Sequence, residues 1–391
     1  MAKNASNGKQ GFLSKFTSSF AAIPCGIIII IFGCIMLWNN EKSYVVDKKD
    51  VKEMRELVTD VKSDNVDSKN DGKLIATSGT LDYGTENLVD EMFGISLSTP
   101  ILERKVEVYA WYEIKKDEDT PADYDRKWVE IDKIEDSSKF EKPAGHENPI
   151  KTDYTISSKT FRVKSLKVGA FTLADNFIDK LKVEDDKLLV PQPTVTLPEG
   201  YAVNGNYITN SVDFSKPEVK DVRISYLYGE YDRVSILGKQ DGSSIVSYTT
   251  AKNSSKAEMF KGTMDSTKML TNIEESNKRK VWIFRIVWTI LVCVGTSMLL
   301  SPLTTLLGYI PFLGKIVNGT LGVVSFLVGF AISIVVMGIA WLVFYPLIGI
   351  IFIAVAVGSI VLAKMYLSKK DDGKKPEVKE ETKTEENKEE N

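Results

Sequence analysis

Residues 320–343 read TLGVVSFLVGFAISIVVMGIAWLV, a run without a single charged side chain. An apolar helix of about 20 residues is long enough to cross the roughly 30 Å of bilayer hydrocarbon, so this run predicts a transmembrane helix. Residues 281–300 and 346–367 form similar apolar runs on either side of it. Together the three runs predict a C-terminal membrane block, and hence an integral membrane protein.

A fourth apolar run covers residues 20–38, behind a polar and basic arm at residues 1–19 that we expect to be cytoplasmic. Such a run can be a secretory signal peptide or an uncleaved first transmembrane helix. The run is long for a signal peptide, and Asn39, Asn40 and Glu41 follow it in place of an Ala-x-Ala cleavage pattern. We therefore predict a transmembrane helix.

Residues 301–318 are apolar but contain Pro302, Gly308, Pro311 and Gly314. Proline removes a backbone donor and disfavours a helix interior, so one straight helix is not expected. We predict short helices that lie in the membrane interface or re-enter it. An ordinary hairpin packed on the bundle is the alternative.

The region between the first two runs, residues 39–280, is rich in charge and in short strand patterns. The clearest is residues 102–114, where apolar and polar side chains alternate as in a half-buried strand. Asp241-Gly242 predicts a hairpin turn. Helical spacing of apolar residues predicts helices at residues 44–63 and 168–181. Further strands are predicted at residues 127–131, 160–163, 219–228 and 233–237.

These patterns predict an α+β fold. A strand-rich extramembrane domain, lumenal or extracytoplasmic, is inserted between one N-terminal and three C-terminal transmembrane helices. The last residues, 368–391, are rich in Lys and Glu and predict a disordered tail. An even number of spans places both termini on one side of the membrane, which we expect to be the cytoplasmic side, although basic residues flank the helices on both sides.

The composition argues against several classes of function. The net charge of −3 gives no basic field for nucleic acid. All three cysteines lie in apolar runs and the chain has one histidine, so we expect no metal and no cofactor. No Asp, Glu or His lies inside an apolar run, which argues against intramembrane catalysis and proton-coupled transport. Arg285 lies near the end of its run and is expected to snorkel to the interface.

Two features have competing interpretations. His146, beside Glu147, can be a general base, but the loop-forming residues around it favour a hydrogen bond that pins a loop. Ser325, Gly329 and Ser333 form a ladder of small residues, which can pack within the chain's own bundle or form a seam between copies. We expect no catalytic residue in either place.

A set of positions along nearly the whole chain resembles the transmembrane protein 43 family, also called LUMA. Their order and spacing carry the resemblance, as in Tyr109-x-Trp111 and in Gly145-His146-x-Asn148-Pro149. We interpret these residues as structural or interaction positions. The full set is Asn40, Glu41, Arg104, Glu107, Tyr109, Trp111, Tyr124, Trp128, Phe140, Gly145, His146, Asn148, Pro149, Arg223, Pro311, Trp341 and Pro346.

The resemblance implies a multi-pass scaffold of the endoplasmic reticulum and inner nuclear membrane. It implies homo-oligomers and, in a eukaryote, partners of the emerin and lamin type. Similar sequences occur in bacteria, where the membrane would be the cytoplasmic one. The alternative is a membrane-anchored domain that binds a lipid or glycan, either as a binding module or as an enzyme, with a deep pocket near Trp111, Trp128 or His146. A channel is disfavoured because the helix faces are apolar.

Overall fold

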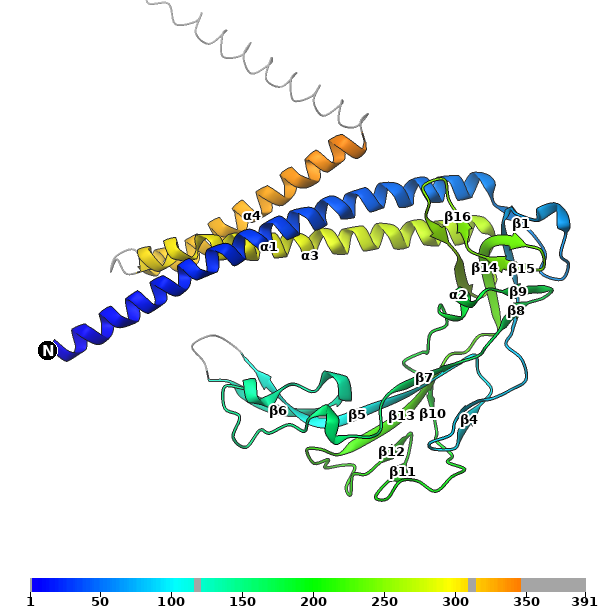
Figure 1. Cartoon of the computed structure of the whole chain (residues 1–391), viewed down its shortest axis with the longest axis horizontal. Coiled ribbons are helices and arrows are strands. Elements are labelled where there is room, and N and C mark those ends of the chain that lie inside the picture. The colour runs from blue at the N-terminus through cyan, green and yellow to red at the C-terminus, as the bar shows by residue number, and fades with distance from the viewer. Residues whose placement is uncertain (1, 116–120, 309–313, 346–391) are drawn as a thin grey trace, which may run out of the picture. The chain divides into compact units, whose positions relative to one another are not determined.

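The computed structural model describes residues 2–115, 121–308 and 314–345 (Figure 1). The chain forms two compact units, a helical unit of Met1–Lys48 and Ser276–Asn391 and a strand-rich unit of Lys49–Glu275. The long helices are α1 (Ala2–Leu57), α3 (Ser266–Gly308) and α4 (Gly314–Phe344).

Within the described residues, three helices are long and apolar enough to cross a membrane, one N-terminal and two C-terminal. Together with the strand-rich region between them, they confirm the α+β prediction. The third C-terminal helix predicted at residues 346–367, and the tail at residues 368–391, lie outside the described residues.

Two helix boundaries differ from the prediction. α1 is continuous, so the helices predicted at residues 20–38 and 44–63 are one. α3 continues through Pro302 to Gly308, although a break was predicted from residue 301. A proline inside a helix costs one backbone hydrogen bond, and neighbouring helices and hydroxyl side chains make this tolerable in a membrane protein.

Small residues allow the helices of the helical unit to approach closely. A Cβ atom added to Gly26 of α1 would lie 2.8 Å from the carbonyl oxygen of Gly295 on α3. One added to Gly329 of α4 would lie 2.7 Å from the Cα of Cys293. Ser333 is fully buried in the same ladder. The ladder of small residues therefore packs within the chain, which was one of its two interpretations.

The first sheet of the strand-rich unit closes on itself. Its strands pair in the order β2, β8, β9, β15 and β14, and β14 pairs again with β2. At the edges, β1 pairs with β2 and β18 pairs with β14. The bounds are β1 (Thr59–Asp60), β2 (Leu74–Asp82), β8 (Leu166–Val168), β9 (Phe171–Leu173), β14 (Arg233–Asp241), β15 (Ser244–Val246) and β18 (Glu258–Lys261).

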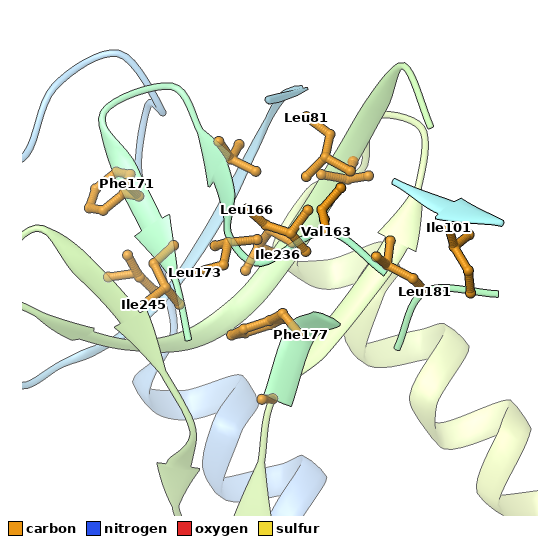
Figure 2. Packing of buried hydrophobic residues seen from close by; sticks show 14 residues of the cluster. Leu81, Ile101, Val163, Leu166, Phe171, Leu173, Phe177, Leu181, Ile236 and Ile245 are labelled. Atoms are coloured by element: carbon orange, nitrogen blue, oxygen red, sulfur yellow. The ribbon is translucent and has the colours of Figure 1, made fainter. Parts of the chain in front are cut away.

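The interior of this closed sheet is a hydrophobic core. Leu166, Phe171 and Ile236 are fully buried there, and the short helix α2 (Asp175–Ile178) adds the buried Phe177. Figure 2 shows Val163, Leu166 and Ile236 gathered between the strands. Because alternate residues of each strand point inward, the closed sheet buries its apolar side chains together with Phe177 of α2.

The helix predicted at residues 168–181 is present only as the short α2 (Asp175–Ile178), and its predicted first part is strand. Val168 and Phe171 pair across a hairpin between β8 and β9. Gly169 turns that hairpin with a φ of 59°, and a Cβ atom there would overlap the carbonyl oxygen of Ser63. Two inward residues separated by a two-residue turn have the same spacing as one helical turn, and this spacing misled the prediction.

The second sheet is built around the long strand β5, which pairs with β13, β6 and β7. Its strands are β5 (Ile101–Ile114), β6 (Asp123–Glu130), β7 (Lys159–Arg162), β10 (Leu188–Leu189), β11 (Ala202–Asn204), β12 (Tyr207–Thr209) and β13 (Val222–Tyr228). Two small hairpins complete the unit, β3 (Leu88–Asp90) with β4 (Ile95–Leu97), and β16 (Tyr248–Thr249) with β17 (Ser255–Lys256).

Candidate functional site

Three helices of the helical unit meet at a charged site. Glu41 of α1 is fully buried, and Arg285 of α3 is only 8% exposed. Arg285 donates from Nε to Oε1 of Glu41 at 2.6 Å and from Nη2 to Oε2 at 2.7 Å. Trp341 of α4 donates from Nε1 to the same Oε2 at 2.8 Å. We call these three residues the helix clamp.

Aromatic rings and a hydrogen bond between α1 and α3 surround the helix clamp. The Arg285 guanidinium lies 4.7 Å from the ring centre of Trp282 and 5.5 Å from that of Trp341. Asn40 donates from Nδ2 to the carbonyl oxygen of Val281 at 3.2 Å. Arg285 is therefore buried and paired, so the predicted snorkelling is wrong. A charge in an apolar bundle is far less costly when its partner is a bidentate carboxylate.

Family positions in the strand-rich unit gather on one face of the second sheet. Side chains alternate along a strand, so Glu107, Tyr109 and Trp111 of β5 point to the same side. The strand register places Trp128 opposite Tyr109, and Arg126 opposite Trp111. We call this surface the aromatic face. It comprises Glu107, Tyr109, Trp111, Glu113, Tyr124, Arg126, Trp128, Tyr207, Phe214 and Arg223.

Two arginines lie over the aromatic rings of this face. The Arg223 guanidinium is 4.7 Å from the ring centre of Trp128, and its Nε donates to Glu107 at 2.7 Å. The Arg126 guanidinium lies 5.8 Å from the ring centre of Tyr109 and 5.0 Å from that of Trp111. No carboxylate of the described residues forms an ion pair with Arg126. Its charge is oriented by rings and available to an anion.

A loop closes one end of the aromatic face. The His146 ring stacks on Tyr124 with ring centres 3.8 Å apart, and its Nδ1 lies 3.0 Å from the carbonyl oxygen of Lys142. Asn148 accepts from the backbone N–H of Trp111 at 2.7 Å and donates to its carbonyl oxygen at 2.9 Å. The loop-pinning hydrogen bond expected of His146 is therefore present.

The carboxylate beside His146 is used by the loop itself. Glu147 accepts a hydrogen bond from the backbone N–H of Gly145 at 3.0 Å, and this bond lowers the pKa of Glu147. Gly145 has a φ of 85°, a conformation that favours glycine. Gly145 and Glu147, the two neighbours of His146, thus stabilise the turn. Two further family positions support the loop, Phe140 against Tyr124 and the buried Pro149.

Arg104 lies on the opposite, buried side of the second sheet. It donates from Nη1 to both carboxylate oxygens of Asp90, at 2.9 and 2.7 Å, and the Tyr226 hydroxyl donates to the same carboxylate at 2.6 Å. Burial and this carboxylate raise the pKa of Tyr226. Arg104 is therefore a core position and does not belong to the aromatic face.

The structure thus divides the predicted site residues. Most lie in the aromatic face and its loop, Glu41 and Trp341 form the helix clamp with Asn40 beside it, and Arg104 is in the core. Pro311 and Pro346 lie outside the described residues. Arg126, two positions before Trp128 and hence on the same side of β6, was missed although strand alternation could have found it. In the described ranges, no group of three or more His, Cys, Asp or Glu side chains could hold a metal ion.

Helices that can span a membrane and a strand-rich insert between them define an integral membrane protein with a large extramembrane domain. The family profile described as Transmembrane protein 43 matches residues 107–346. The chain belongs to this family.

Relatives of this family match almost end to end. The chain is 23% identical to mouse Transmembrane protein 43 over 389 residues, which cover 93% of this chain and 94% of the relative. The human protein of that name gives the same identity and coverage. A Drosophila melanogaster protein named Transmembrane protein 43 homolog is 23% identical over 83% of this chain and 89% of its own length. No solved structure matches significantly.

Proposed function

We propose that this chain is a multi-pass membrane scaffold that assembles with itself and with protein partners, without catalysis. In a eukaryote the membrane would be that of the endoplasmic reticulum and nuclear envelope, with cytoplasmic termini and partners of the emerin and lamin type. In a bacterium it would be the cytoplasmic membrane. Family membership and the spanning helices support a membrane role. The helix clamp links the three described long helices, which would hold the membrane part of the scaffold together.

The observation that carries the proposal is the aromatic face. Trp, Tyr and Arg dominate the residues that contribute most to protein–protein binding. Arg126 adds a cation that is oriented by two rings and has no carboxylate partner among the described residues. The chemistry that fits it is an acidic side chain on an extended or loop segment of a partner, which would pair with the guanidinium.

A lipid- or glycan-binding domain is the alternative function, and the packing of the rings bears on it. Tyr109 and Trp128 have ring centres 5.3 Å apart, and Trp111 and His146 have ring centres 4.8 Å apart. Arg126 and Arg223 lie over the same rings. Ring faces already occupied by protein groups favour a broad partner surface over a deep small-molecule pocket.

Charge reversal at two adjacent positions of β6 tests the proposal. Arg126→Glu changes the aromatic face, while Lys127→Glu makes the same change on the opposite side of the strand, where Lys127 lies over Tyr112. Each full-length variant is crosslinked in its native membrane, and the captured proteins are quantified. We expect Arg126→Glu to lose partners that Lys127→Glu retains. Identical capture by both variants would contradict the proposal.

A further inference from the structure

A cavity of about 310 Å³ lies between α1 and α3 in the helical unit, apart from the helix clamp. One end of it is apolar and is lined by Met36, Phe284 and Trp288. The other end is polar and is lined by Asn39, Ser43 and Lys280. The cavity therefore changes from apolar to polar along the helix axes.

This change follows from the sequence. On α1 the apolar run ends at Trp38, so Met36 lies within the run, whereas Asn39 and Ser43 lie beyond it. Lys280 precedes the apolar run of α3, and Phe284 and Trp288 follow at spacings that keep them on one face. Met36 and Ser43 are separated by about 10 Å along the helix, since each residue rises about 1.5 Å. The cavity thus spans the boundary between hydrocarbon and headgroups.

The polar end of the cavity carries the cation of Lys280. Lys280 forms no ion pair with any described residue, and its side chain is exposed. Two neighbouring groups are already paired, because Arg285 binds Glu41 and Asn40 donates to the carbonyl oxygen of Val281. A phosphate group would complement Lys280, and the Asn39 amide and Ser43 hydroxyl can donate to its oxygens.

We infer that this cavity binds one phospholipid. Its phosphodiester lies at Lys280, Asn39 and Ser43, and the first part of an acyl chain lies against Met36, Phe284 and Trp288. Asp47 also lines the polar end, and its negative charge disfavours a headgroup with a net negative charge. The ligand class is therefore a zwitterionic phospholipid such as phosphatidylethanolamine. This inference is independent of the aromatic face and of the proposed scaffold function.

The test is lipid binding by the full chain in mild detergent, measured by native mass spectrometry with added phosphatidylethanolamine or phosphatidylglycerol. Lys280→Gln should lower phosphatidylethanolamine binding about tenfold, the effect of losing one charged hydrogen bond. Ser43→Leu, which fills the polar end, should also lower it. Arg279→Gln is the matched control, since Arg279 is adjacent but does not line the cavity, and it should bind as the unaltered protein does.

Three outcomes would overturn the inference. The first is equal binding by Lys280→Gln, Ser43→Leu and Arg279→Gln variants whose thermal unfolding midpoints are unchanged. The second is tighter binding of phosphatidylglycerol than of phosphatidylethanolamine, which would contradict the ammonium-bearing headgroup. The third is displacement of the lipid by millimolar inorganic phosphate, which would mean that the acyl chain contributes nothing.

Discussion

Arg285 and Glu41 form a bidentate ion pair between α3 and α1, with N–O distances of 2.6 and 2.7 Å. The two residues are 244 positions apart in the chain. Trp341 of α4 donates to the same carboxylate. One buried carboxylate therefore fixes the register of three membrane helices. Sliding α1 or α3 by one turn would separate the two charges, and sliding α4 would remove the hydrogen bond from Trp341.

Breaking the helix clamp on one side should be costly. Glu41→Ala leaves Arg285 buried without a counter-charge and should destabilise the full-length protein in detergent by roughly 3–5 kcal/mol. The double variant Glu41→Leu, Arg285→Met removes both charges and should be clearly more stable than Glu41→Ala. Thermal unfolding followed by circular dichroism measures both. If the double variant were as unstable as the single one, the ion pair would not be the reason for the loss.

A single methyl group on Gly26 should disturb helix packing. Its Cβ atom would lie 2.8 Å from the carbonyl oxygen of Gly295, so Gly26→Ala should destabilise by about 1–3 kcal/mol. Gly338→Ala on α4 is the matched control, since nothing lies within 4 Å of its Cβ position among the described atoms. It should be neutral or slightly stabilising because Ala favours a helix. Unfolding midpoints of the two variants test the contrast.

The buried Asp90–Arg104–Tyr226 network should stabilise the second sheet. Tyr226→Phe removes the hydrogen bond to Asp90 and should cost about 1.5–3 kcal/mol. Asp90→Ala strands the Arg104 charge, which is 3% exposed, and should cost roughly 3–5 kcal/mol. Chemical denaturation of the full chain measures both losses. A smaller loss for Asp90→Ala than for Tyr226→Phe would contradict this description of the network.

The loop at the aromatic face should weaken in acid. Glu113 accepts from the backbone N–H of Glu141 at 2.8 Å, and this bond, aided by Lys115, lowers the pKa of Glu113. A lowered folded pKa means that the stabilisation is complete above the unfolded value of about 4.3 and is lost as the pH falls through the folded value. Glu113→Gln should therefore lower the unfolding midpoint at pH 6, and the difference should shrink below about pH 4. A difference that does not change with pH would rule out ionisation as the cause.

Local patterns predicted much of the strand-rich unit. The alternation at residues 102–114 became β5, and Asp241-Gly242 turns the hairpin of β14 and β15, with Asp241 paired to Ser244. The same local reasoning misread the first part of the helix predicted at residues 168–181, because spacing alone does not distinguish a tight hairpin from a helical turn. Closure of the first sheet depends on pairing β2 with β14, which are distant in the chain.

The candidate site residues likewise fall into those that local sequence could predict and those that depend on distant contacts. The family positions on β5 and β6 could be assigned to one face from strand alternation and resemblance. The partner of Arg285 could not, because Glu41 lies beyond the predicted first span and only the continuous α1 presents it to α3. The loop at His146 was foreseen from its loop-forming residues, but its stacking on Tyr124 depends on a separate strand.

The most direct test of the scaffold proposal compares two tyrosines of β5 that point to opposite sides. Photoreactive benzoylphenylalanine replaces Tyr109 on the aromatic face in one full-length protein, and Tyr112 on the other side in a second. After irradiation of intact membranes, crosslinked proteins are separated by mass and identified. The account predicts defined protein adducts from position 109 and few from position 112. Equal adducts from both positions, or none from position 109, would contradict it.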